Sequence, residues 1–393
     1  MHLTLPPLFS IALILGFGII FARLANLIKL PSVTGYIILG ILIGPYILSL
    51  VSKDILSSSS FITTMVLTVI AYSLGPSFKI KEFRKKGKSV IFISIGEVLG
   101  AFIIVTLGIW LIGGVALNTA MLIGAIAPAT DPAAIILVAK EYRAKGEVTD
   151  TLLRVVAIDD AWGIMLFAIV LALYDVISGA SGSAQMFKEL LKAVIEIVGS
   201  MGIGITIGIV FKLFIRFIKT KSQLVVFVFF GIFLAGGTAD MLHLSPLLSG
   251  MALGATVANL INSKRIFNIL EGIDAPLYIL FFVLAGATLN LSNMLTPGII
   301  ALIYVFTRLP GEMLGAFLGA KISKASDMVK KYLGLALAPQ AGVAIGLAII
   351  VAHKSQAAGS LILATIIVTT VIYELFGPVL VKIALEKAGE ITK

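Results

Sequence analysis

The sequence predicts an all-α polytopic membrane protein of about 13 transmembrane helices, arranged as an inverted-topology repeat with two crossed, broken helices. Composition is the first reason, because 59% of the residues are hydrophobic, 13% are charged and the mean hydropathy is +1.11. The second is that apolar runs of the roughly 20 residues needed to cross a bilayer follow one another almost end to end. The third is an internal repeat that relates the two halves of the chain.

The apolar runs define the predicted helices in chain order, with boundaries that hold to within a few residues. They are 8–28, 33–51, 61–78, 89–112, 115–139, 152–174, 189–218, 223–240, 245–261, 275–290, 297–320, 331–352 and 359–381. The opening MHLTLPPLFS lacks a basic segment and a small-residue cleavage site, so we expect the first helix to be retained. The seventh run follows SGASGSA (178–184) and is interpreted as a linker.

Lysine and arginine predict the orientation. Most of the 30 basic residues fall in one set of alternating loops; the other set holds only Lys53, Lys188, Lys192 and Lys354, and Arg308 lies in no loop. By the positive-inside rule the N-terminus is outside and the C-terminus cytoplasmic, which requires an odd number of spans. We therefore expect an integral protein of the inner (plasma) membrane. The net charge of +10 reflects topology, so no nucleic-acid partner is predicted.

Three short motifs recur in order along the chain. GEVLGAF (96–102) returns as GEMLGAF (311–317), AIAP (125–128) as ALAP (336–339), and LPSVTGYIILG (30–40) loosely as LSPLLSGMALG (244–254). Seven predicted helices separate each pair, so the two copies enter the membrane in opposite directions. This is typical of a transporter whose site lies where broken helices meet at the midplane. A channel or scaffold with a composition-driven repeat is the alternative.

Prolines interrupt two of the equivalent helices. Pro128 and Pro132 bracket Thr130 and Asp131 in one, and Pro339 is followed by Gln340 in the other. Proline removes an amide donor and clashes with the preceding turn, and non-helical backbone is tolerated at membrane depth only inside protein or beside water. We expect the breaks to cross, with Asp131 offsetting the positive helix N-termini. Simple proline kinks are the alternative.

Asp159 and Asp160 lie about two turns into the sixth predicted helix. Ionisable residues at this depth are costly and indicate function. Adjacent side chains on a helix point roughly 100° apart, so the two carboxylates are expected to take different partners. A carboxylate in a cavity suits a small alkali cation or a proton, and one site with two exclusive occupants is a transport mechanism. The alternative is that both make ordinary buried hydrogen bonds.

One basic residue is predicted at membrane depth. Arg308 lies at the middle of the eleventh helix, with Glu312 one turn on, and Glu97 takes the equivalent of Glu312 in the first repeat. An unpaired guanidinium there would be prohibitively costly, so Arg308 must meet Glu97, Glu312 or Asp159. We favour a static pair with the glutamates over one that changes partner during transport.

These residues together resemble the cation/proton antiporters of the NhaA/NapA fold, in particular the second monovalent cation:proton antiporter family. LPSVTGYIILGILIGP (30–45) resembles its second-helix signature and LAPQAGVAIGLA (337–348) its broken helix. The resemblance implies Asp160 as the main ion and proton carboxylate, Asp159 as its partner, and Thr130 and Asp131 lining and balancing the break.

The same resemblance implies a domain organisation and a homodimer. Residues 1–88 and 222–296 would form a dimerisation domain, 89–175 and 297–393 a moving core, and 176–221 the linker. One position departs from the pattern: electrogenic members carry lysine in a G-K-x-x-G setting, where this chain has Gly311-Glu312-Met313-Leu314-Gly315. Because Arg308 would not release a proton, the resemblance favours electroneutral exchange.

The predicted function is secondary Na⁺ (or Li⁺)/H⁺ antiport by elevator-type alternating access, without a cofactor beyond the transported ions and with Na⁺ at Asp159 and Asp160. A K⁺/H⁺ antiporter and a sodium-coupled organic-anion symporter are the alternatives. An intramembrane aspartyl protease needs two aspartates from separate helices, usually in a G-x-G-D context, and neither feature is evident. We therefore do not predict an enzyme.

Overall fold

A computed structural model describes residues 5–177, 183–261, 264–270, 273–288, 298–340, 342–354 and 356–391. Within these ranges the chain forms α- and 3₁₀-helices joined by turns, with no strand, which confirms the all-α class. The helices are α1 (Pro7–Leu27), α2 (Ser32–Ile43), α3 (Lys53–Ser57), α4 (Ser59–Ser73), η1 (Gly75–Phe78), α5 (Ile80–Leu111), α6 (Leu117–Ile126), α7 (Pro132–Glu141), α8 (Glu147–Ile177), α9 (Ser183–Phe214), η2 (Ile215–Phe217), α10 (Lys221–Met241), α11 (Pro246–Leu260), α12 (Lys264–Phe267), α13 (Asp274–Thr288), α14 (Gly298–Ile322), α15 (Asp327–Tyr332), η4 (Gly334–Leu337), α16 (Gly342–Lys354) and α17 (Gln356–Lys387).

Each predicted apolar run contains at least one helix over its described residues. Among the described residues, six helices are by themselves long and apolar enough to cross a membrane. They are α1, the Gly87–Leu111 part of α5, the Val194–Phe217 segment, α10, α14 and the Ala358–Lys387 part of α17. The integral membrane class follows from these spans, and the count of thirteen stays a prediction.

Two helices extend beyond their predicted apolar runs. The run 89–112 agrees with the apolar span Gly87–Leu111, but α5 itself already begins at Ile80. The basic stretch before residue 89 is helical because lysine, arginine and glutamate are good helix formers, and helical backbone bonds do not stop at the bilayer surface. The linker helix α9 already begins at Ser183; residues 178–182 of the predicted flexible stretch lie outside the described residues.

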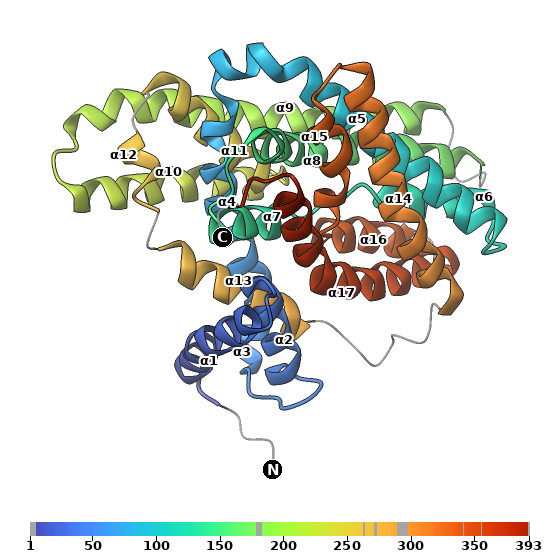
Figure 1. Ribbon diagram of the computed structural model, residues 1–393, viewed down its shortest axis with the longest axis horizontal. Coiled ribbons are helices and arrows are strands. Elements are labelled where there is room, and N and C mark those ends of the chain that lie inside the picture. Colours follow the sequence, from blue (N-terminus) through green and yellow to red (C-terminus); the bar gives the residue numbers. More distant parts are fainter. Residues whose placement is uncertain are drawn as a thin grey trace.

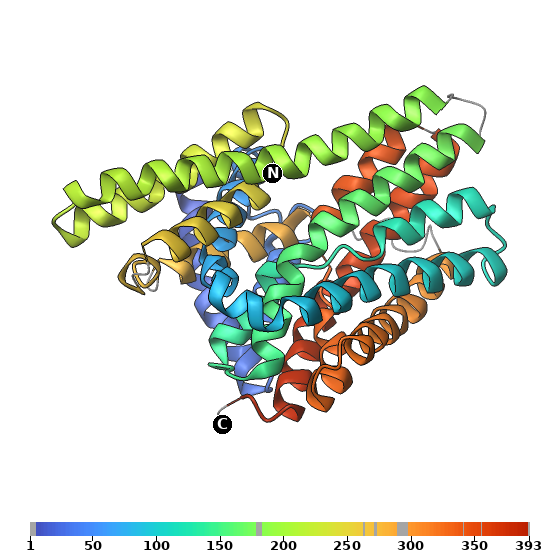
Figure 2. The ribbon, with the colours of Figure 1, turned by 90° about the horizontal axis from the view of Figure 1, so that it is seen from above.

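The helices form two groups that long elements connect. Helices α5, α6, α14, α16 and α17 gather on the right of Figure 1, while α1, α2, α3 and α13 gather below. The long helix α9 runs across the molecule in Figure 2 and packs against α8, α10 and α11. This arrangement agrees with a linker role for α9, and the division into core and dimerisation domains remains a prediction.

The repeated glycine motifs pack against each other. Along α5 and α14, a Cβ on Gly96 or Gly100 would overlap the carbonyl oxygen of Gly315 or Gly311, respectively. Small residues at such contacts let helix backbones approach closely. Because rising residue numbers on α5 face falling ones on α14, the two helices are antiparallel, as an inverted repeat requires.

Loops that carry basic residues lie together at one end of the molecule. Lys382 Nζ donates to the carbonyl of Lys29 at 2.7 Å, and the amide of Lys145 donates to the carbonyl of Glu390 at 2.9 Å. The Glu390 carboxylate also accepts the amides of Val148 and Thr149 at the start of α8, each at 2.7 Å. Three segments that the positive-inside rule assigns to one side of the membrane thus lie together in the structure.

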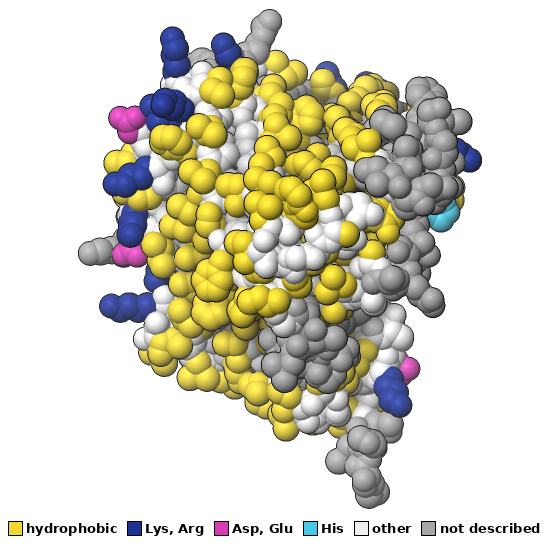
Figure 3. All heavy atoms as spheres, turned by 90° about the vertical axis from the view of Figure 1, so that its right-hand side faces the viewer, with side chains coloured by type: hydrophobic (Ala, Val, Ile, Leu, Met, Phe, Trp, Pro, Cys, Tyr) yellow, Lys and Arg dark blue, Asp and Glu magenta, His cyan; other side chains and the backbone are white. Residues whose placement is uncertain are grey.

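The surface is mostly hydrophobic, as expected for a protein that faces lipid. Hydrophobic side chains cover most of the face shown in Figure 3, while Lys and Arg gather along its left edge. Large apolar side chains of α1 and α9, such as Ile19, Leu24, Ile205 and Leu213, are exposed. In water such a surface would be an aggregation hazard, whereas in a bilayer it meets hydrocarbon.

Candidate ion-translocation site

The first broken helix is the pair α6 and α7, with residues 127–131 between them. Pro132 is the first residue of α7, where its missing amide costs nothing. The Asp131 carboxylate caps α7 by accepting the amides of Ala133 and Ala134 at 2.9 and 3.3 Å. A negative charge there also offsets the positive end of the helix dipole. The predicted balancing role of Asp131 thus has a definite geometry.

The second broken helix consists of η4 and α16, and it touches the first. Around Pro339 the chain leaves the 3₁₀ turn Gly334–Leu337 and resumes as a helix at Gly342. The amide of Asp131 donates to the carbonyl of Pro339 at 2.9 Å. The two interruptions are therefore joined by a backbone hydrogen bond and are not independent proline kinks.

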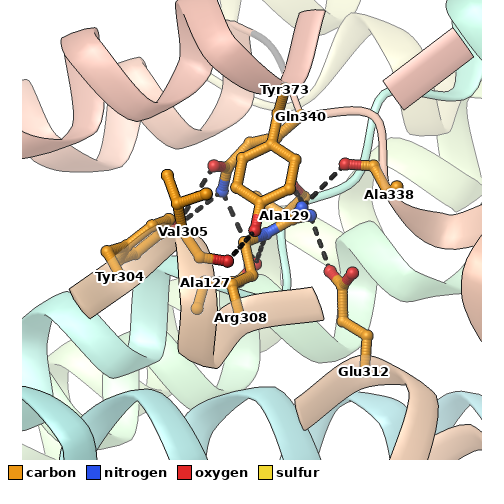
Figure 4. A network of polar contacts seen from close by, with 9 residues as sticks. All are labelled: Ala127, Ala129, Tyr304, Val305, Arg308, Glu312, Ala338, Gln340 and Tyr373. Atoms are coloured by element: carbon orange, nitrogen blue, oxygen red, sulfur yellow. Dashed lines mark hydrogen bonds and ion pairs between the residues drawn. The ribbon is translucent and has the colours of Figure 1, made fainter. Parts of the chain in front are cut away.

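Arg308 on α14 connects both breaks (Figure 4). Its Nε donates to the carbonyl of Ala127 at 2.8 Å, its Nη1 to Ala338 at 2.7 Å and its Nη2 to Ala129 at 3.4 Å. The guanidinium is fully buried, and its planar fork suits several acceptors at once. Arg308 therefore satisfies carbonyls that unwinding leaves without helical partners on both segments.

The same arginine is neutralised by Glu312. Nη2 lies 2.6 Å from Glu312 Oε1, and both side chains are fully buried. The Tyr373 ring stacks on the guanidinium with its centroid 4.4 Å from Cζ. Gln340 and Tyr304 complete the surroundings, with a hydrogen bond of 2.8 Å between them. Of the three carboxylates open to Arg308 in the sequence, Glu312 is the one that forms the ion pair.

Asp159 and Asp160 on α8 do take different partners. Asp159 accepts a hydrogen bond from the hydroxyl of Ser94 on α5 and has Glu97 as a charged neighbour. Asp160 instead has Asp131 as its charged neighbour. Glu97 has Asp159, Glu312 and Arg308 as charged neighbours, so it lies between Asp159 and the Arg308–Glu312 pair.

Several buried oxygens in this region have no hydrogen-bond partner among the described residues. They are Thr130 Oγ1, Asp159 Oδ2, Asp160 Oδ1, both oxygens of Glu97 and Oε2 of Glu374. Buried polar atoms are normally paired, so each such group calls for an explanation. Carboxylate and hydroxyl oxygens are the ligands of hard cations and the acceptors of protons. Their gathering beside two helix breaks suits transient ion binding.

A resident metal centre is not indicated. Within the described part of the chain, no three His, Cys, Asp or Glu side chains converge as a metal site would require. An alkali cation needs fewer charged ligands, because carbonyl and hydroxyl oxygens complete its coordination.

Sequence reasoning missed four residues of this region. Ser94, Tyr304 and Tyr373 look like ordinary members of apolar helices, and only their neighbours in space reveal them. Glu374 had a signal, because it is an acid inside the apolar run 359–381. It is 5% exposed and has Asp131 as its charged neighbour.

A membrane-embedded helical bundle in which two broken helices meet beside buried carboxylates defines a secondary transporter. Residues 10–387 match the family described as sodium/hydrogen exchanger, transmembrane. The chain belongs to this family, which confirms the resemblance to cation/proton antiporters.

Curated relatives agree with this class. The chain is 25% identical to Na(+)/H(+) antiporter 1 of Methanocaldococcus jannaschii, over 83% of this chain and 78% of that protein. It is 24% identical to the ammonium/H(+) antiporter subunit AmhT of Alkalihalophilus pseudofirmus, over 96% and 94%. It is also 23% identical to the high-affinity Na(+)/H(+) antiporter NhaS3 of Synechocystis, over 79% and 69%.

Solved structures share the fold. The sodium proton antiporter MjNhaP1 of Methanocaldococcus jannaschii at pH 8 aligns with a TM-score of 0.68 and 23% identity, over 98% of this chain and 96% of that one. The electron-microscopy structure of MjNhaP1 aligns with a TM-score of 0.75 and 21% identity, over 98% of both chains.

Proposed function

We propose that this protein exchanges Na⁺ or Li⁺ for H⁺ across the membrane, using Asp159 and Asp160 alternately for the cation and the proton. The observation that carries the proposal is Asp160. Its carboxylate is 5% exposed, has one oxygen without a partner and has Asp131, at the joined breaks, as its charged neighbour. A buried carboxylate needs a counter-charge, and either a cation or a proton supplies it.

The two carboxylates have different parts in this proposal. Asp160 binds the cation directly, with Thr130 as a neutral oxygen ligand from the first break. Asp159 is its partner on the other side of α8, where the hydroxyl of Ser94 holds it close to Glu97. Arg308 remains fixed because it holds three carbonyls and Glu312. The exchanged protons therefore come from carboxylates alone.

The test is a proteoliposome assay with an imposed pH gradient and a pH-sensitive dye. Addition of NaCl or LiCl should collapse the gradient at concentrations at which liposomes without protein show no response. KCl should be included, because K⁺ has nearly the size of the ammonium ion named for one relative. A response to K⁺ alone would make the protein a K⁺/H⁺ antiporter. If none of the three cations changes the pH gradient, the proposal is overturned, and uptake of organic anions should be measured instead.

We further propose an elevator movement of the core helices against α2, α4 and α11. A narrow gap where α7 and α8 face α4 and α11 is lined only by apolar side chains, including Pro132, Val156, Leu74 and Met251. Apolar contacts are non-directional, so such a surface slides without breaking hydrogen bonds.

Several polar contacts must open in this movement, and that of Glu141 is a charge-assisted one. Glu141 at the end of α7 accepts the amide of Ser32 at 3.0 and 3.2 Å and its hydroxyl at 2.9 Å. Glu141 thereby supplies the charge-assisted cap that Pro31 cannot give to α2. The contact joins the core to the dimerisation side.

A covalent bridge at this contact should stop transport. The chain has no cysteine, so a Ser32→Cys/Glu141→Cys variant offers a unique pair for a short bifunctional thiol reagent. We expect the bridged protein to lose exchange and to regain it when a cleavable bridge is reduced. The Ser32→Cys single variant treated in the same way should keep its rate. Full exchange in the bridged protein would refute movement at this point.

The remaining features of the proposal concern orientation and assembly. We propose the inner (plasma) membrane, with the N-terminus outside and the C-terminus cytoplasmic, because the basic loops group on one side. We propose a homodimer through the dimerisation domain, as the resemblance implies.

A further inference from the structure

A groove opens on the outer surface of α14, on the half of that helix that leads to a basic loop. Its volume is about 690 Å³, and its walls come from α14, α15 and η4. Pro310, Met313, Leu314 and Phe317 form the α14 side. Their spacing of three and four residues places them on one face of the helix. This face remains open to the surroundings, since Leu314 is 53% and Phe317 40% exposed.

The groove extends from the middle of α14 towards the end of the molecule where basic residues lie. At 1.5 Å per residue, the segment from Pro310 to Phe317 spans about 10 Å. Half of the hydrocarbon core of a bilayer is about 15 Å thick, so the groove covers most of the depth of one leaflet. Gly334 brings η4 against α14 here, because a Cβ on this residue would lie 2.6 Å from Cα of Met313.

Lysine side chains form the rim of the groove at its basic end. Lys330 and Lys331 of α15 line it directly. The stretch 318–335 contains four lysines and one acid, Asp327. Lys330 Nζ lies 3.0 Å from Asp327 Oδ1, in a pair whose aspartate is 97% exposed, and exposed pairs of this kind are weak. The rim therefore keeps a net positive charge that attracts an anion.

We propose that this groove binds an anionic phospholipid. Its phosphate group meets Lys330 and Lys331. One acyl chain lies along Met313, Leu314 and Phe317. Basic pockets between transmembrane helices, on the side that we propose to be cytoplasmic, suit acidic lipid headgroups. Because lipid tails are as apolar as leucine, the chain gains little by leaving the bilayer for an apolar wall, so the lysines decide which lipid stays.

A second groove on the surface shows the difference. The groove between α9 and α11 has a volume of about 470 Å³, and its lining residues carry no charge. Any lipid of the bilayer fills such a groove equally well. A second copy of the chain is a poor occupant of the groove on α14, because two copies that met through this face would place their lysine rims next to each other.

The deep end of the groove lies beside a buried ion pair. Pro310 stands between Arg308 and Glu312 on α14. A lipid bound along this part of the helix stabilises the folded protein, as does any ligand that binds the folded chain and not the unfolded one. Binding is therefore measurable as a rise of the thermal midpoint as well as by direct detection of the lipid.

The test uses delipidated protein in detergent, to which phosphatidylglycerol or phosphatidylcholine is added at equal concentration. Native mass spectrometry counts the lipids that each protomer retains, and a thermal melt gives the midpoint. Phosphatidylglycerol should be retained in preference and should raise the midpoint by a few degrees. Lys330→Gln/Lys331→Gln should weaken its binding about 30-fold, since each lysine contributes roughly a factor of five. Lys145→Gln/Lys387→Gln, at exposed positions outside the groove, removes the same charge and should bind as the wild type does.

Leu314→Trp tests the apolar wall, because it fills the groove from an exposed position and leaves the lysines unchanged. It should also lower the retention of phosphatidylglycerol; unchanged retention would show adsorption to the lysines alone and overturn the inference. Equal retention of both lipids by the wild type, or equal binding by the two double-lysine variants, would overturn it too. Dissociation of a dimer by Leu314→Trp without loss of lipid would assign the groove to a second copy. None of these measurements involves ion exchange, so their outcome is independent of the proposed antiport.

Discussion

Replacement of Asp160 by asparagine is expected to abolish cation/proton exchange while leaving the protein folded. The amide keeps the shape of the side chain but carries neither a charge for the cation nor a site for the exchanged proton. Loss of a buried charge partner costs ~3 kcal/mol, which corresponds to a fall of about 100-fold in cation affinity. We expect the rate to drop at least as far, because both substrates lose their site.

Unlike its exchange activity, the stability of the Asp160→Asn variant should be unchanged or higher than that of the wild type. Asp160 is 5% exposed and one of its oxygens has no partner, so the substitution removes a poorly compensated buried charge. Neutral replacements of buried charges are often harmless or stabilising, and we expect the thermal midpoint in detergent to be unchanged or raised. Asp240→Asn, at an exposed carboxylate at the end of α10, is the control for both measurements. Near-normal exchange in Asp160→Asn would move the site to Asp131 or Glu312.

Replacement of Arg308 by methionine is expected to give the largest loss of stability. The substitution leaves the carbonyls of Ala127, Ala129 and Ala338 without their hydrogen-bond donor. It also leaves the buried Glu312 carboxylate without its ion-pair partner. Removing one partner of a buried ion pair costs roughly 3–5 kcal/mol. The measurement is the thermal midpoint in detergent, with Arg23→Met at an exposed position as the control.

Two companion variants separate charge from geometry. Arg308→Lys keeps the charge but not the planar fork, so it should be intermediate in stability. Arg308→Met/Glu312→Gln removes the stranded charge, so it should recover part of the loss, as expected for residues in direct contact. A thermal midpoint for Arg308→Met within about 2 °C of the wild type would contradict this account of the breaks.

The helix breaks and the buried acids of the candidate site were predictable from the sequence because their signals are local. Pro128, Pro132 and Pro339 interrupt helices by their own covalent structure. Asp159 and Asp160 stand out because a charge in an apolar run is costly in any fold that spans a membrane. The helix that begins at Ile80 shows the limit of such reasoning, because a bilayer boundary does not end a helix.

Pairing was not predictable, because it depends on which helices become neighbours. Ser94 reaches Asp159 across 65 positions of sequence, and Arg308 reaches Ala127 across 181. A serine or a tyrosine in an apolar helix has no distinguishing pattern of its own. Glu97 shows the same point, since its equivalence to Glu312 in the repeat suggested Arg308 as partner, and only the fold shows that Asp159 is a charged neighbour too.

The amino-acid sequence by itself determined the membrane class, the repeat, the two breaks and the acids near them, since each follows from composition or from the covalent chemistry of single residues. Only the tertiary structure decided that Asp131 caps α7, and that one guanidinium donates to carbonyls of both breaks and pairs with Glu312. The physical reason is that a buried charge is stabilised by whatever lies within a few ångströms, and those neighbours come from distant parts of the chain.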